Sequence, residues 1–291
     1  MLNIDIGFVG IQRPFNDYYA CLFKSKVSTW RKAFRSPEMF YGYVSLAAYD
    51  STDADGGSER STSGLPRMRL DQNSVLSLPN TGVALALDLG DNGRVPFTPR
   101  SARHGGIHPR NKTEVARRMA LAYAATGLNQ TDVIATGPVF AAATATTTGS
   151  SSSSSSSDAG AVTVTVSFTA GSVGGGIAMS PTAQCNLVDP RVTSVAACCS
   201  SVPRNTNKGN KSITSDGGVP FELLDSHTGE FVLAAKTTIS ADGKSVVLVG
   251  PPGVAFSAVR YCEQGYPLCV LRNGAGLPAM PFLANLTAAP I

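Results

Sequence analysis

The 291-residue sequence predicts an α/β layer followed by a β-rich, sandwich-like part. Apolar residues at steps of three and four predict helices in the first part. Two short and almost wholly apolar runs there predict strands that are covered on both faces. Beyond Gly137 the apolar residues alternate with period two, which is typical of antiparallel strands. We therefore expect an α/β domain over residues 1–137 and a β-rich domain over residues 138–291.

The first part shows helix, strand, loop, strand, loop and helix in that order. The stretch "NDYYACLFKSKVSTWRKAF" predicts a helix with one apolar stripe, formed by Tyr19, Phe23, Val27, Trp30 and Phe34. The runs "FYGYVSLAAY" and "TGVALALDLG" predict buried, parallel strands, and "DSTDADGGSERSTSG" between them predicts a surface loop. The last helix should begin at Pro109, with Val115, Met119, Ala120 and Tyr123 on one side and Arg117 and Arg118 on the other.

The second part consists of short strands and turns. "AVTVTVSF" alternates with period two, and "FVLAAKTTISADGKSVVLVG" predicts a hairpin with Asp242 and Gly243 at its tip. A serine-rich insertion at about residues 144–160 should be exposed and poorly ordered. "GSVGGG" at residues 171–176 lacks the Lys-Ser/Thr of a phosphate loop, so it predicts a turn or a bulge.

Composition excludes several classes of protein. The hydrophobic fraction of 43% and the charged fraction of 15% are those of a globular protein. The net charge of +4 comes from scattered residues, so nucleic acid is not expected as a partner. No apolar run has the length of a membrane span, and the first residues lack the features of a secretory signal. The sequence leaves the oligomeric state open.

The cysteines favour an oxidising compartment. None of the six has the C-x-x-C spacing of a zinc site, and five lie in the second half of the chain. We expect Cys262 or Cys269 within disulfide reach of Cys198 or Cys199. Disulfides without a secretion signal are a conflict, and one resolution is that this chain lacks its natural N-terminus.

His108 is the candidate for proton transfer. It follows two glycines and precedes a proline, between a strand and a helix, which is where active sites of open α/β sheets lie. A neutral imidazole there could take a proton from a serine hydroxyl. The alternative is an exposed loop histidine. His104 lies on the same glycine-containing loop, so a metal pair is not expected, and His227 lies in a polar turn.

Five stretches of the sequence, in order, resemble the sialate O-acetylesterases, a family of SGNH hydrolases. They are "STWRKAF", "MRLDQ" (with Arg69 and Gln72), "LPNTGVALALDLGD", "IHPRNKTEVARRMALAYAATG" and "AVRYCEQGYPLCVLRNGAGLPAMPFLA". The resemblance covers the C-terminal portion of the enzyme. It implies that residues 1–137 are the C-terminal half of an SGNH-type, flavodoxin-like hydrolase domain.

The resemblance implies an esterase that removes O-acetyl groups from sugars such as sialic acids. His108 then corresponds to the general base, and Asp91 is the candidate orienting acid, although a surface carboxylate is an alternative for Asp91. No nucleophile is identified, because the Gly-x-Ser-Asn-Met-like segment of the family is absent from this sequence. The chain alone should therefore be weak or inactive, and the alternative is an inactive remnant or a carbohydrate-binding module. No cofactor and no metal are expected, and the family implies a secreted or lysosomal location.

Overall fold

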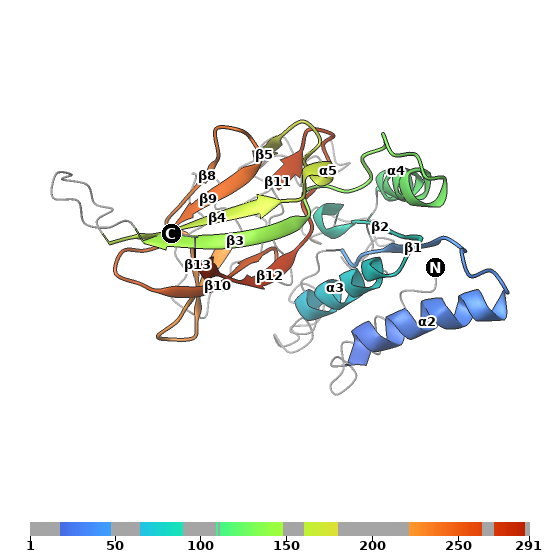
Figure 1. Cartoon of the computed structure of the whole chain (residues 1–291), viewed down its shortest axis with the longest axis horizontal. Coiled ribbons are helices and arrows are strands. Elements are labelled where there is room, and N and C mark those ends of the chain that lie inside the picture. The colour runs from blue at the N-terminus through green and yellow to red at the C-terminus, as the bar shows by residue number, and fades with distance from the viewer. Residues whose placement is uncertain are drawn as a thin grey trace, which may run out of the picture. The chain divides into compact units, whose positions relative to one another are not determined.

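The computed structural model describes residues 18–47, 65–89, 109, 111–147, 160–179, 221–263 and 271–288. These residues form two compact units, and the chain passes from the first to the second between Thr136 and Gly137 (Figure 1). The first unit mixes helices with a sheet, and the second consists mainly of strands. The predicted mixture of α and β structure is therefore confirmed at this level.

The first unit is built around two parallel strands. Strand β1 (Tyr41–Val44) pairs with β2 (Thr81–Ala84), so that Tyr41 lies opposite Thr81 and Val44 opposite Ala84. All four residues of β2 are buried, as its apolar sequence predicts. The remaining elements are α2 (Tyr19–Ala33), α3 (Leu65–Asn73), the short 3₁₀ helices η4 (Ser74–Ser77) and η5 (Leu87–Leu89), α4 (Lys112–Ala122), and a π-helical turn η6 (Tyr123–Gly127).

Helix α4 covers one face of this sheet. Successive side chains of a strand point to opposite faces, and Gly42 and Gly82 lie on the face toward α4. A Cβ on Gly42 would lie 2.5 Å from the sulfur of Met119, and a Cβ on Gly82 would lie 3.0 Å from the Cβ of Ala122. The two glycines therefore allow the helix to approach the strands closely.

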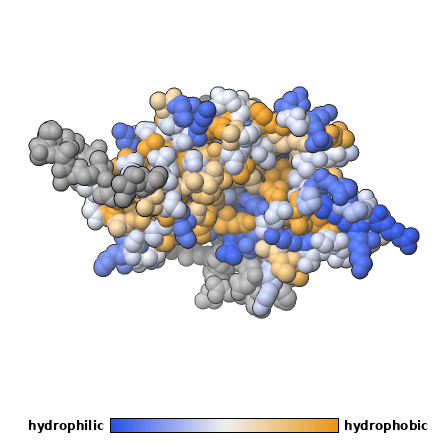
Figure 2. Space-filling model, in the orientation of Figure 1, coloured by the Kyte–Doolittle hydropathy of each residue, from blue (hydrophilic) through white to orange (hydrophobic). Residues whose placement is uncertain are grey.

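Helix α2 covers the opposite face. The rings of Tyr41 and Tyr43 lie 5.9 and 5.4 Å from the ring of Phe23, centroid to centroid. The predicted stripe of α2 is confirmed for its buried residues Tyr19, Phe23 and Val27. It is wrong for Phe34, which is 68% exposed, because the helix ends at Ala33. Figure 2 shows that the outer side of α2 is largely hydrophilic.

Helix α3 was not expected from the spacing of apolar residues. Three of its buried side chains are polar, those of Arg69, Asp71 and Gln72. Such a helix lacks the apolar stripe on which the sequence prediction depends.

The sequence placed the start and the polar face of α4 incorrectly. The helix begins at Lys112 after the N-cap residue Asn111, whose side-chain oxygen accepts a hydrogen bond from the Glu114 N–H at 3.0 Å. Pro109 lies before the cap and is buried. Arg118, expected on the polar face, has only 3% of its side chain exposed. A buried carboxylate facing it explains the difference, as described below.

The second unit contains three sheets. Their strand orders are β12-β10-β6-β7, β13-β3-β4-β9-β8 and β11-β5, antiparallel except for the parallel pair of β13 and β3. The strands are β3 (Phe140–Thr147), β4 (Val162–Phe168), β5 (Ile177–Met179), β6 (Phe221–Asp225), β7 (Phe231–Leu233), β8 (Lys236–Ile239), β9 (Ser245–Val249), β10 (Phe256–Tyr261), β11 (Leu271–Asn273), β12 (Phe282–Asn285) and β13 (Thr287–Ala288).

Aromatic rings join the two larger sheets of this unit. Phe282 of β12 contacts Phe140 of β3, with the ring centroids 4.6 Å apart, and Phe168 of β4 at 6.5 Å. On the side of its own sheet Phe282 stacks on Tyr261 at 6.0 Å. The core of the second unit therefore lies around Phe282.

The predicted turns of the second unit are partly confirmed. Strands β8 and β9 form the expected hairpin, with Gly243 at φ +67°. Strand β3 extends to Thr147, so the first residues of the predicted serine-rich insertion belong to a strand, and the serines themselves lie outside the described residues. In "GSVGGG" a short helix, α5 (Ala170–Val173), precedes Gly174 in the left-handed conformation, so the stretch is a helical turn and not a bulge.

Two of the six cysteines are described. Cys21 is exposed with a free thiol, and Cys262 is buried. Cys198, Cys199 and Cys269 lie outside the described residues, so the disulfide prediction stays a prediction. Within the described part of the chain, no helix has the length and apolarity needed to cross a membrane.

Candidate functional site

The carboxyl ends of β1 and β2 lie side by side. The Ser45 N–H donates to the carbonyl of Ala84 at 3.1 Å, and the Ser45 hydroxyl accepts from the Ala86 N–H at 3.1 Å. Ala47, Ala86 and Leu89 then form a buried apolar cluster against Val115 of α4. In open α/β sheets this edge of the sheet is where ligands bind.

A buried arginine holds the end of β1. Arg69 of α3 is 1% exposed and donates from Nε to the carbonyl of Leu46 at 3.1 Å and from Nη2 to that of Ala47 at 2.7 Å. The Gln72 side-chain oxygen accepts from the Leu46 N–H at 3.0 Å. Arg69 and Gln72, which the sequence identified only through a resemblance, thus fix the backbone that leaves β1.

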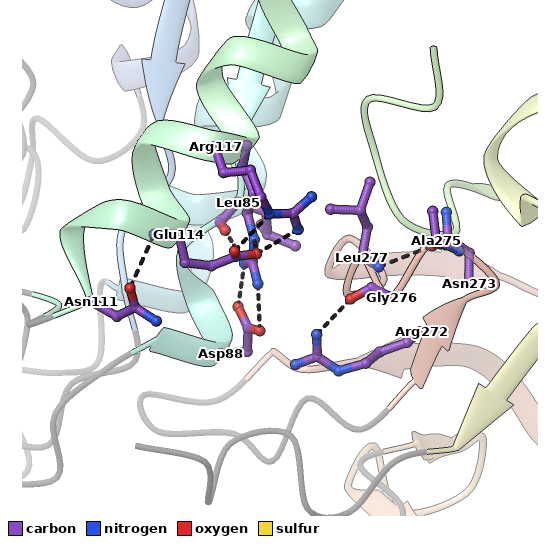
Figure 3. A network of polar contacts seen from close by, with 11 residues as sticks. Leu85, Asp88, Asn111, Glu114, Arg117, Arg272, Asn273, Ala275, Gly276 and Leu277 are labelled. Carbon is purple, nitrogen blue, oxygen red and sulfur yellow. Dashed lines mark hydrogen bonds and ion pairs between the residues drawn. The ribbon is translucent and has the colours of Figure 1, made fainter. Parts of the chain in front are cut away.

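A second buried arginine holds the end of β2. Arg118 of α4 donates to both carboxylate oxygens of Asp88, from Nη1 to Oδ1 at 2.6 Å and from Nη2 to Oδ2 at 2.9 Å (Figure 3). Its Nη1 also donates to the carbonyl of Leu85. Burial lowers the pKa of Arg118, but the hydrogen bonds and charges of Asp88 and Glu114 outweigh that effect and raise the pKa. Arg118 therefore stays charged although its side chain is only 3% exposed.

Glu114 extends this network to the first turn of α4. Its Oε1 accepts from Arg118 Nε at 2.8 Å and from Arg117 Nη2 at 2.7 Å. The hydrogen bond from Arg117, together with those from Arg118, lowers the pKa of Glu114 to about 2. A carboxylate in the first turn also interacts favourably with the helix dipole. We call Leu85, Asp88, Glu114 and Arg118 the Arg118 network.

The predicted site residues His108 and Asp91 lie outside the described residues. The described residues nearest to them in the chain are Leu89, at the end of η5, and Pro109, before α4, and both are buried. The sequence did not identify Asp88 and Arg118 as a pair. The signal that could have found them is a carboxylate within an apolar run, which must be neutralised by a buried partner.

The stretch 258–284, the last one that carries the resemblance, makes defined contacts where it is described. Arg260 of β10 donates to Glu222 at 2.7 Å and lies 3.9 Å from the centre of the Phe231 ring. The stretch Gly276-Leu277-Pro278 follows a turn closed by Asn273, whose side-chain oxygen accepts from the Leu277 N–H at 3.0 Å. Among the described residues, no group of three histidine, cysteine or acidic side chains could hold a metal ion.

Known proteins similar to this chain are carbohydrate esterases. Over 136 residues the chain is 31% identical to the sialate O-acetylesterase of Rattus norvegicus, a match that covers 42% of this chain and 22% of that protein. The human sialate O-acetylesterase is 29% identical over 136 residues, covering 42% of this chain and 23% of that protein. The chain thus spans less than a quarter of the length of these relatives. No family model matches it.

A solved structure extends the likeness to most of the chain. The crystal structure of a carbohydrate acetylesterase from Xanthomonas citri covers 94% of this chain and 48% of its own, with a TM-score of 0.62 and 22% identity. At this identity the likeness shows the fold alone. Together with the sequence matches, it confirms the predicted resemblance of the chain to the sialate O-acetylesterases.

Proposed function

We propose that this chain contributes to a sialate O-acetylesterase-like carbohydrate esterase, which removes O-acetyl groups from sugars such as sialic acids. The observation that carries the proposal is the match of 31% identity over 136 residues to a sialate O-acetylesterase. The fold likeness to a carbohydrate acetylesterase supports it. In this proposal the first unit is the C-terminal half of an SGNH-type domain.

In the proposed mechanism His108 is the general base. It takes the proton of a serine hydroxyl as the serine oxygen attacks the acetyl carbonyl, and it then gives that proton to the departing sugar oxygen. Water hydrolyses the acetyl-serine by the same two steps. Asp91 accepts a hydrogen bond from the other ring nitrogen and orients the imidazole.

We further propose that the serine and the oxyanion donors come from sequence outside these 291 residues. The family's serine segment is absent from the sequence given. The loss of a single oxyanion donor typically lowers turnover by about 10²–10³-fold. The 291-residue chain should therefore release acetate very slowly.

Acetate release by three proteins at equal concentration tests the proposal. These are the 291-residue chain, the chain joined to or co-expressed with a segment that carries the serine motif, and the same combination with His108→Ala. We expect activity only in the second protein. Rapid release by the first would reveal a nucleophile within the chain, and full activity of the third would remove His108 from the mechanism. Sugar binding without any release would favour the carbohydrate-binding module.

A further inference from the structure

The sequence contains four Asn-x-Ser/Thr triplets, the acceptor motif for N-linked glycans. Three of them begin at the described residues Asn111, Asn129 and Asn285, and Asn210 lies outside the described residues. Such triplets also arise by chance in a chain rich in serine and threonine, so the motif alone does not identify a modified residue. A folded chain has room for a bulky glycan only where the asparagine amide faces solvent.

The Asn129 triplet lies in an exposed turn after η6. Residues 127–132 are all exposed. Within the part of the chain that the structure describes, the side chains of Asn129 and Thr131 make no hydrogen bond. Both the amide that would accept the sugar and the hydroxyl that completes the motif are therefore accessible.

The backbone of Asn129 is nevertheless held in place. The N–H of Leu128 donates to the carbonyl of Tyr123 at 2.9 Å, and that of Gln130 donates to the carbonyl of Ala124 at 3.0 Å. Asn129 itself has φ +52°, a left-handed conformation that asparagine tolerates and that commonly ends a helix. This structural role uses only the backbone, so it leaves the side chain available for modification.

The Asn111 triplet is already used within the fold. The Asn111 side-chain oxygen accepts a hydrogen bond from the Glu114 N–H at 3.0 Å, and the residue is only partly exposed. Thr113 belongs to the first turn of α4. A glycan at this position would have to grow from a side chain that is fixed against the helix.

The Asn285 triplet is divided between two sheets. Asn285 is the last residue of β12, whereas Thr287 belongs to β13 in the neighbouring sheet. The Thr287 hydroxyl donates to the carbonyl of Ala143 at 3.1 Å. The hydroxyl of this triplet is therefore engaged, although Asn285 itself is exposed.

We propose that Asn129 carries an N-linked glycan. The Asn129 Nδ2 atom loses one proton and forms a bond to the anomeric carbon of an oligosaccharide. The bond from that carbon to the diphosphate of a polyprenyl diphosphate donor breaks, and the diphosphate leaves. The chain meets such a donor in the secretory route, in keeping with the oxidising compartment that the cysteines favour.

The glycan also has a physical consequence at this position. Leu128 and Tyr123 are 54% and 46% exposed, and their backbones are joined by the hydrogen bond described above. A hydrophilic oligosaccharide on the adjacent residue screens these apolar side chains from other molecules.

The test expresses the 291-residue chain behind a secretion signal in eukaryotic cells. Release of the glycans by an amidase in heavy-oxygen water marks each modified asparagine as a labelled aspartate, and peptide mapping then gives the occupancy of each triplet. We expect the highest occupancy at Asn129 among the three described triplets. Asn129→Asp and Thr131→Ala should each remove one glycan, whereas Thr131→Ser should keep it because serine preserves the motif.

Asn111→Gln is the matched control. It removes another triplet and should leave the number of glycans unchanged. Occupancy of Asn129 no higher than that of Asn111 or Asn285 would overturn the proposal. Retention of the chain inside the cells does not affect the result, because the same peptides are then recovered from the cell extract.

A second measurement tests the screening of apolar side chains. The Asn129→Asp chain should bind more of a hydrophobic dye than the glycosylated wild type, and adding Leu128→Ser should reduce that difference. Equal dye binding by the glycosylated wild type and Asn129→Asp would overturn the screening role.

Discussion

Gly137 and Pro278 lie so close that a Cβ on residue 137 would be 2.0 Å from the carbonyl oxygen of Pro278. The neighbouring Pro138 carbonyl accepts a hydrogen bond from the Met280 N–H at 3.0 Å, so the two backbones are fixed against each other. Glycine is therefore required where the chain enters the second unit.

Gly137→Ala should destabilise the protein by about 1–3 kcal/mol, because backbone atoms cannot move aside as a flexible side chain can. Thermal unfolding measures the effect. The control is Gly171→Ala in α5, where a Cβ would meet nothing within 4 Å and stability should stay the same or rise. Equal melting temperatures for Gly137→Ala and the wild type would contradict the close approach.

Arg118→Leu should lower the free energy of unfolding by about 3–5 kcal/mol, since it leaves the Asp88 carboxylate buried without its partner. Urea unfolding followed by circular dichroism measures this. Arg67→Ala is the control, because Arg67 is 63% exposed in its pair with Asp71 and should contribute less than about 1 kcal/mol. Similar losses in the two variants would mean that the Arg118 network is not the buried anchor described here.

The contribution of Glu114 to the stability of the folded protein should depend on pH. Its folded pKa of about 2 lies below the ordinary value of 4.5, so its stabilising effect is fully present above pH 4.5 and is lost as the pH falls through 2. The stability difference between the wild type and Glu114→Gln should shrink across this window. Because the side chain is partly exposed, 1 M salt should reduce the difference as well. A difference independent of pH between 2 and 5 would contradict the assignment.

Replacement of Lys26 by an apolar residue should stabilise the folded protein. Its ammonium is buried with no hydrogen-bond partner among the described residues and lies 4.8 Å from the centre of the Trp30 ring. Burial lowers the pKa of Lys26, so the folded state disfavours the charged form in spite of the aromatic rings. Lys26→Met should therefore raise stability at pH 7 by less than about 1 kcal/mol.

This gain should disappear above pH 10.5, the ordinary pKa of lysine, because the side chain is then neutral in both the folded and unfolded states. Thermal unfolding at pH 7 and pH 11 makes the comparison. Lys24→Met on the same helix controls for the loss of one positive charge. A lower melting temperature for Lys26→Met at pH 7 would show that cation–π attraction outweighs desolvation.

Thiol chemistry tests the cysteine prediction. Alkylation of the native protein should label the exposed Cys21. Peptide mapping without reduction should recover a peptide that links Cys262 or Cys269 to Cys198 or Cys199. Labelling of all six cysteines without reduction or unfolding would end the argument for an oxidising compartment.

Elements with a regular apolar pattern were predictable from the sequence. Helix α2, the buried strand β2 and the hairpin of β8 and β9 all follow from the spacing of their own residues. Helix α3 was not predictable in this way, because what holds it is a set of polar contacts from Arg69 and Gln72 to a strand end more than twenty residues away in sequence.

The sequence predicts a site at the carboxyl edge of the sheet, but it does not predict the buried side chains that hold this edge. A histidine between a strand and a helix indicates the carboxyl edge of a sheet. The pairing of Asp88 with Arg118, thirty residues apart, is a tertiary contact that local periodicity does not encode. The same limit applies to Pro109, since a proline suits either the first helical position or the chain before the cap, and the Asn111 side chain decides between them.

The pairing of β13 with β3 affects how the protein is made on the ribosome. Thr287 of β13 donates its hydroxyl hydrogen to the carbonyl of Ala143, which lies 144 positions earlier in the chain. Strand β12, which pairs with β10, directly precedes β13 and is therefore also made late. The described elements of the first unit all precede Gly137, so they can fold while translation continues. The second unit must wait, with the edge of β3 uncovered, until its last strands emerge. During that interval a nascent chain is open to wrong strand pairing, and a chaperone that covers this edge would raise the yield of folded protein.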